Sequence, residues 1–128
     1  MTTGDDLADL KIVMKEFVDD LRHIFTSGAE QRDLLIIQLF FERLSPERIM
    51  HHMISKVLPH AKIISLRDSN YFVEHDTIFQ ALPQSRSKHY RDFWSGQGER
   101  NLSVDDKNAI WAYFDTIIEI VKSYKKLN

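Results

Sequence analysis

The sequence predicts an all-α fold, a compact orthogonal bundle of five or six helices that forms one domain over residues 1–128. Apolar residues recur at steps of three and four along most of the chain, as they do on one face of a helix. Four glycines and three prolines are too few for the many turns of a sandwich or barrel. The hydrophobic fraction of 43% and the charged fraction of 28% are ordinary for a globular domain.

The first predicted helix covers residues 5–26. Asp5 and Asp6 stand where negative charge stabilises a helix N-terminus. Ser27-Gly28 is a typical helix end, because glycine accepts the left-handed backbone conformation. The apolar stripe of this helix consists of Leu7, Leu10, Val13, Met14, Phe17, Leu21, Ile24 and Phe25.

The second predicted helix covers residues 29–44, and its apolar residues point in nearly every direction around the axis. The stretch from Leu34 to Phe41 is also compatible with a buried strand. Good helix formers flank it without a breaker, which favours a helix. We therefore expect this helix to be the most buried element, central in the bundle and packed on more than one side.

Ser45-Pro46 predicts the start of a third helix, because serine caps free amides and proline suits the first helical position. Pro59 ends it. Between residues 60 and 87 we predict two short helices, at about 60–68 and 74–81, although Ala61–Leu66 also fits a strand and 70–73 contains β-leaning residues. Residues 85–101 are polar and predicted to be loop-like.

The last helix, predicted at about 104–125, has the clearest signals. Ser103 is a plausible N-cap, and Asp105 and Asp106 follow in the first turn. Lys122 and Lys125 suit the negative end of the helix dipole. The predicted core of the bundle consists of Leu10, Phe17, Leu21, Leu35, Leu39, Ile54, Ile78, Trp111, Phe114 and Ile118.

Motifs for catalysis or metal binding are missing from the sequence. The chain has no cysteine, which excludes disulfides, thiolate metal sites and a cysteine nucleophile. It has no His-Glu-x-x-His, Gly-x-Ser-x-Gly or Walker sequence. The acidic pairs lie where capping and solvation explain them. We expect no catalytic residues, no cofactor and no metal, while an enzyme with an unrecognised site stays a third alternative.

Hydropathy and charge narrow the location and partners that we expect. No apolar run approaches the roughly 20 residues that a membrane span needs. The acidic start of the chain does not look like a signal peptide. An intracellular protein without a membrane partner is therefore expected. The net charge of −2 does not suggest a general nucleic-acid binder.

Two groups of basic residues are candidate contacts for nucleic acid or a partner. Arg86, Lys88, Arg91 and Arg100 alternate with aromatic residues that include Phe93 and Trp94. Aromatic and basic side chains together can bind single strands by stacking and phosphate contact. Packing of the two large aromatics against the last helix is the favoured alternative. The second group, Lys122, Lys125 and Lys126, is explained by the helix dipole but could touch phosphate or an acidic partner surface.

The aromatic pair and the last helix also carry a family resemblance. Phe93-Trp94, followed by Leu102-Ser103-x3-Lys107-x2-Ile110-Trp111-x-Tyr113-Phe114, resembles a pattern in small uncharacterised helical proteins of nucleocytoplasmic large DNA viruses. Their Phe-x-x-Asp-Leu-x3-Phe-Pro signature is similar to Phe17-x-x-Asp20-Leu21-x3-Phe25 here, with Thr26 in place of proline. Phe114 replaces their leucine, and Leu82-Pro83 matches their Leu-Pro segment. The resemblance implies a viral protein that works in the host cytoplasm or nucleus or is packaged in the virion.

These observations together lead to a functional expectation. The leading hypothesis is a non-enzymatic viral protein-interaction module with a protein partner or a homo-oligomer, as a virion component or an accessory factor in assembly or transcription. The alternative is a nucleic-acid-binding accessory protein that uses the basic and aromatic segment Arg86–Arg100.

Overall fold

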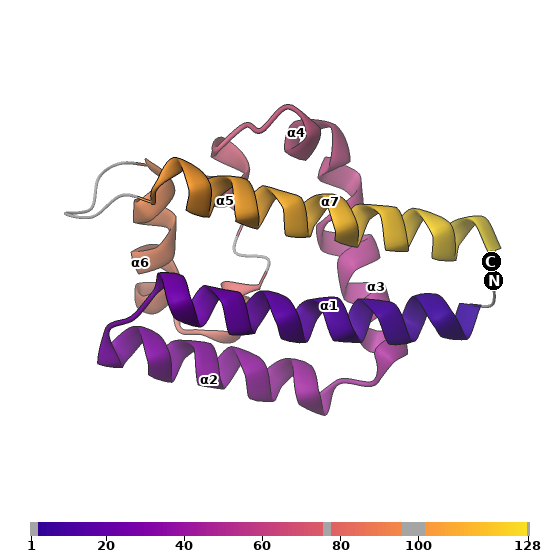
Figure 1. Ribbon diagram of the computed structural model, residues 1–128, viewed down its shortest axis with the longest axis horizontal. Coiled ribbons are helices and arrows are strands. Elements are labelled where there is room, and N and C mark those ends of the chain that lie inside the picture. Colours follow the sequence, from indigo (N-terminus) through magenta and orange to yellow (C-terminus); the bar gives the residue numbers. More distant parts are fainter. Residues whose placement is uncertain (1–2, 76–77, 96–101, 128) are drawn as a thin grey trace.

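Three long helices lie side by side and two others cross them steeply (Figure 1). The computed structural model describes residues 3–75, 78–95 and 102–127. Helix α1 (Thr3–Ile24) lies between α2 (Gly28–Arg43) and α7 (Val104–Leu127) and runs antiparallel to both. Helices α3 (Pro46–Lys56) and α6 (Gln84–Ser95) cross them. The predicted all-helical bundle is confirmed.

Serine side chains fix the starts of three helices. The Oγ of Ser45 accepts from the amide of Arg48 at 3.3 Å, and the Oγ of Ser103 accepts from the amide of Asp106 at 3.0 Å. Both caps were predicted from the sequence. Ser27 was read as part of a helix end, but it also begins α2 through a reciprocal capping box with Glu30.

The middle of the chain differs from the sequence prediction. It contains the 3₁₀ turn η1 (Leu58–His60), α4 (Ala61–Ser65), α5 (Asn70–Glu74) and the 3₁₀ turn η2 (Phe79–Ala81). The helix predicted at 74–81 does not match the described residues: α5 ends at Glu74, and only a 3₁₀ turn forms at Phe79–Ala81. Residues 76 and 77 of that prediction lie outside the described part of the chain. The β-leaning residues of α5 adopt a helix because it buries Tyr71 and Phe72 in the core, where packing outweighs a weak local preference.

The predicted loop at 85–101 is also wrong throughout its described part, residues 85–95, where α6 forms. Its signal was a short stripe of Ser87, Tyr90, Phe93 and Trp94, whose spacing places them on one face. The many polar residues between them cover the opposite face of the helix. Residues 96–101 of the predicted loop lie outside the described residues.

The core is centred on α1 rather than on the second helix. Helix α1 packs against α2, α3 and α7, whereas α2 lies at the edge of the bundle (Figure 1). Leu35 and Leu39 were predicted to be buried, but their exposed fractions are 44% and 41%. Ile54 is only partly buried. The other predicted core residues are buried, namely Leu10, Phe17, Leu21, Ile78, Trp111, Phe114 and Ile118.

Among the described residues, no helix combines the length and the apolar character that crossing a membrane requires.

Candidate functional site

The aromatic residues of the predicted nucleic-acid segment are packed into the core. Phe93 and Trp94 are only 7% and 8% exposed. The Trp94 ring stacks on Phe72 at a centroid distance of 4.0 Å and meets Trp111 edge-on at 5.6 Å. The favoured packing interpretation of this aromatic pair is therefore correct. Neither ring offers a face on which a base could stack.

Two of the predicted basic contacts have acidic partners within the fold. Arg86 on α6 donates to Oδ2 of Asp33 on α2 from Nε at 3.0 Å and from Nη2 at 2.6 Å. Tyr90 donates to the same oxygen at 2.6 Å. Lys88 pairs with Asp92 one turn along α6, at 3.0 Å. The positive charges of Arg86 and Lys88 are therefore paired with carboxylates of the protein itself.

The buried carboxylate of Glu30 completes this junction between α2 and α6. Glu30 is fully buried, and its Oε2 lies 2.8 Å from Nε2 of His89. Its Oε1 accepts from the amide of Ser27, as part of the capping box. Burial is the first cause of the raised pKa of Tyr90, and the hydrogen bond to Asp33 is the second. This cluster was not visible in the sequence, because its residues on α2 lie more than 50 positions from those on α6.

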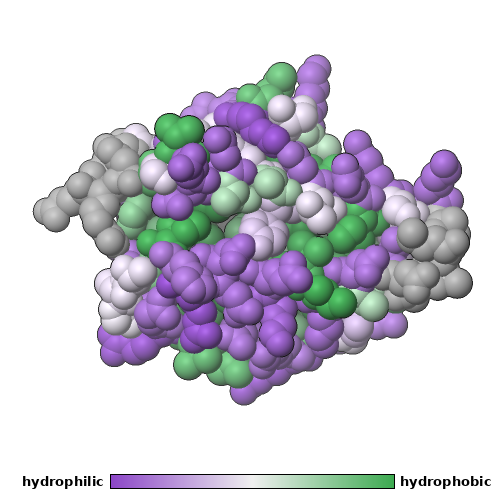
Figure 2. All heavy atoms as spheres, in the orientation of Figure 1, coloured by the Kyte–Doolittle hydropathy of each residue, from purple (hydrophilic) through white to green (hydrophobic). Residues whose placement is uncertain are grey.

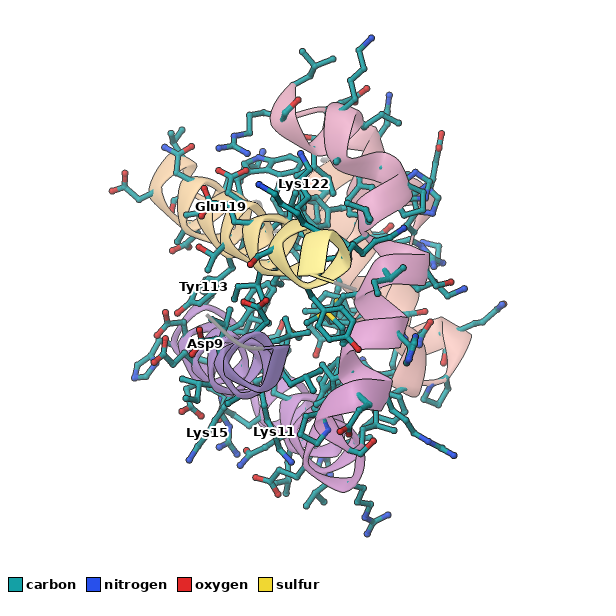
Figure 3. The ribbon with its side chains drawn as sticks, turned by 90° about the vertical axis from the view of Figure 1, so that its right-hand side faces the viewer. Asp9, Lys11, Lys15, Tyr113, Glu119 and Lys122 are labelled. Carbon is teal, nitrogen blue, oxygen red and sulfur yellow. The ribbon has the colours of Figure 1, made fainter. Side chains whose placement is uncertain are left out.

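The remaining predicted basic residues do not gather at one place. Arg91 is partly buried and lines a small internal cavity bordered by aromatic side chains. Arg100 lies outside the described residues. Lys122, Lys125 and Lys126 lie on the last turns of α7, and Lys122 points away from α1 (Figure 3). The structure therefore does not unite the two predicted groups into one basic surface.

A different surface, which we call the α1–α2 face, exposes apolar side chains. On α2 it comprises Leu35, Ile36 and Leu39, whose exposed fractions lie between 41% and 47%. On α1 it includes Ile12, which is 55% exposed. Figure 2 shows a small group of hydrophobic side chains among hydrophilic ones at the lower edge of the molecule, where Figure 1 places α2. Single exposed apolar side chains are common on protein surfaces, whereas a group of them on one helix face is more informative.

A groove of about 130 Å³ runs between α1 and α2 within this face. Its floor is apolar and includes Met14 and Val18 of α1, Phe41 of α2 and Ile49 of α3. Ile12 also lines it. An apolar hollow beside exposed leucines is a common form of binding site for a protein segment or a small apolar ligand.

Basic side chains border the groove on the α1 side. Lys11 and Lys15 line it and are one helical turn apart. Figure 3 looks at the molecule from the end that holds the termini, and both lysines extend from α1 away from α7. Gln38 and Glu42 line the opposite side, and Gln38 donates to Glu42 at 3.0 Å.

Two arginines frame the apolar residues of α2. Arg32 and Arg43 are exposed and share its outer face with Leu35, Ile36 and Leu39, because their spacing brings them to one side of the helix. In the part of the chain that the structure describes, neither arginine has a side-chain hydrogen bond or ion pair, and the same holds for Lys11 and Lys15. This face thus combines apolar surface with four unpaired basic side chains and one carboxylate, that of Glu42.

Elsewhere on the described surface, fewer large apolar residues are exposed. Ile63 and Leu66 of the α4 region are 39% and 69% exposed, and Val104 at the start of α7 is 74% exposed. Among the described residues, no group of three or more histidine, aspartate or glutamate side chains is arranged to hold a metal ion. The α1–α2 face is therefore the candidate site with the most support.

Comparisons of the chain with protein-family models, with curated proteins and with solved structures found no match.

Proposed function

We propose that this protein is a non-enzymatic interaction module that binds a protein partner through the α1–α2 face. One observation carries the proposal: Leu35, Ile36 and Leu39 are exposed together on α2, beside an apolar groove. Contiguous exposed apolar surface of this kind marks an interaction site more often than chance exposure does.

The energetics of burial support this use of the face. Covering the exposed part of one leucine or isoleucine contributes roughly 1 kcal/mol, since complete burial contributes about 1.5–3 kcal/mol. Covering all four exposed side chains would contribute roughly four times as much as covering one. These side chains are Ile12, Leu35, Ile36 and Leu39. That gain must offset the loss of translational and rotational freedom on association. A partner that also fills the groove gains further contacts with its apolar floor.

The biological setting that we propose rests on the sequence resemblance alone. In that setting the module is a viral protein that works in the infected cell, as a virion component or as an accessory factor in assembly or transcription. The nucleic-acid alternative stays a prediction, but its segment has lost support. Phe93 and Trp94 are buried, and Arg86 and Lys88 are paired with carboxylates.

The proposal is tested by comparing wild type with a variant in which two exposed apolar side chains of the face are replaced by polar ones. Leu35→Gln with Leu39→Gln removes exposed apolar surface without adding charge, and glutamine is a good helix former. Affinity purification from expressing or infected cells, with mass spectrometry, should recover partners with wild type that the double variant loses. The matched control is Leu66→Gln, which removes an exposed leucine elsewhere and should retain them.

Two results would contradict the proposal. One is an unchanged set of partners for the double variant, provided that circular dichroism shows the same helicity and melting temperature as wild type. The other is recovery of nucleic acid alone, with a yield that falls steeply as salt rises. Steep salt dependence reflects the release of counterions from neutralised phosphates.

A further inference from the structure

We infer that the occupant of the α1–α2 groove is an acidic amphipathic helix of another protein. The inference rests on the proposed function and names the chemistry of the partner. Three features carry it: the shape of the groove, the positive charge that borders it, and the poor fit of a second copy of this chain.

The groove has the shape that a helix needs. It lies between two antiparallel helices and has an apolar floor, so that a third helix laid along it would complete a local three-helix arrangement. The α1 residues that line the groove run from Lys11 to Val18, a stretch of about 10 Å at 1.5 Å per residue. A partner helix of at least about two turns covers that length and would present apolar residues at steps of three and four.

The charges around the groove favour carboxylates on that helix. Lys11 and Lys15 line the groove on the α1 side, and the Glu42 carboxylate, which accepts a hydrogen bond from Gln38, lines it on the α2 side. Arg32 and Arg43 add positive charge farther away, on the outer face of α2 beyond the exposed leucines. A helix seated in the groove would place one polar flank beside Lys11 and Lys15. Glutamate or aspartate on that flank can form ion pairs with the two lysines, which would repel basic residues there.

A second copy of this chain fits the face poorly. A two-fold pairing of α2 with α2 of a second copy, centred on Ile36 and Leu39, would set Arg32 of one copy opposite Arg43 of the other. Placing the outer face of α2 into the groove of another copy would set its arginines against Lys11 and Lys15. Both arrangements bring like charges together, which disfavours association.

The test measures binding of the full chain to two synthetic peptides by fluorescence anisotropy. Both are helix-stabilised peptides of about 14 residues with the same leucine stripe, long enough for roughly four turns. One carries glutamate on both flanks and the other carries lysine. We expect the acidic peptide to bind about tenfold more tightly than the basic one at low salt, a difference of roughly 1.4 kcal/mol. Added salt should shrink that difference by screening.

Substitutions in the protein locate the contact. Lys11→Glu with Lys15→Glu should reverse the preference and favour the basic peptide. The control, Lys56→Glu with Lys62→Glu, changes the net charge equally at exposed positions away from the groove and should keep the acidic preference. Leu35→Gln with Leu39→Gln should weaken the binding of both peptides.

The outcomes separate this inference from the proposed function. Equal binding of the two peptides, or binding of neither while leucine-dependent partners are still recovered from cells, overturns the acidic helix and leaves the interaction module standing. Leucine-dependent dimers in sedimentation velocity would assign the face to a second copy. Binding to phosphatidylserine vesicles in preference to both peptides would assign it to an anionic membrane. Each of these results would overturn the inference.

Discussion

Two buried carboxylates join α6 to α2. Glu30 faces His89, and Asp33 accepts hydrogen bonds from Arg86 and Tyr90. A buried carboxylate is stable only when hydrogen bonds replace the water that it loses. This junction therefore sets where α6 lies, and with it the position of the aromatic residues that α6 places in the core.

The Tyr90 hydroxyl is predicted to stabilise the fold measurably. Tyr90→Phe removes one hydrogen bond to a buried carboxylate and should lower the free energy of unfolding by roughly 2 kcal/mol. Tyr113→Phe is the matched control, because Tyr113 also donates to an aspartate, Asp20, at a more exposed position. It should cost less than about 1 kcal/mol. Urea denaturation measures both, and equal losses would show that burial does not strengthen the Tyr90 contact.

Helix α2 has two apolar faces that lie in different environments, one in the core and one at the surface. Leu34, Ile37 and Phe41 point into the core and are at most 5% exposed. Leu35 and Leu39 point outward on the α1–α2 face. Neighbouring residues of the same type can therefore differ completely in environment, because each step turns the helix by about 100°.

Adjacent leucines of α2 give a direct test of this assignment. Leu34→Ala should lower the free energy of unfolding by about 2–5 kcal/mol, because it leaves a cavity in the core. Leu35→Ala keeps the same helix and the same substitution but should cost less than about 1 kcal/mol, since its side chain is already 44% exposed. Thermal and chemical unfolding of the two variants provide the comparison. Similar losses would mean that α2 is buried on both sides.

At the scale of the whole molecule, the free energy of unfolding depends on pH because packing brings His60 of η1 close to His75 at the end of α5. Burial lowers the pKa of His60, and the charge of His75, whose ring centroid lies 4.2 Å from that of His60, lowers it further. A lowered histidine pKa means that the unfolded chain binds the proton more readily. The stability linked to His60 is therefore complete above its unfolded pKa of about 6.5 and is lost as pH falls below that value.

The corresponding prediction compares urea denaturation at pH 7.5 and pH 5.0. Wild type should lose stability between these values, and His60→Gln should lose less, because the variant removes the titrating group. Asp115 does not contribute to this window. Its pKa is lowered by its hydrogen bonds from Arg67, so its contribution is lost only at more acidic pH, as the carboxylate is protonated. An identical pH slope for wild type and His60→Gln would contradict the assignment.

The sequence determined the helical class and most of the long helices, since caps and apolar periodicity are local properties of the chain. Ser45 and Ser103 marked helix starts, and the predicted core residues Trp111, Phe114 and Ile118 marked the buried face of α7. The stripe within α6 was also visible, but the polar residues around it hid the helix.

Only the tertiary structure decided which apolar residues stay exposed and which charges are paired. Leu34 and Leu35 look alike in the sequence, and the choice between them depends on α1 covering one side of α2 and leaving the other uncovered. Arg86 looked available until the fold placed Asp33 beside it, 53 positions earlier in the chain. Burial and charge pairing depend on distances between elements, whereas periodicity and capping involve neighbours within a few residues. The candidate site contains residues of both α1 and α2, so it can be recognised only once the packing of these two helices is known.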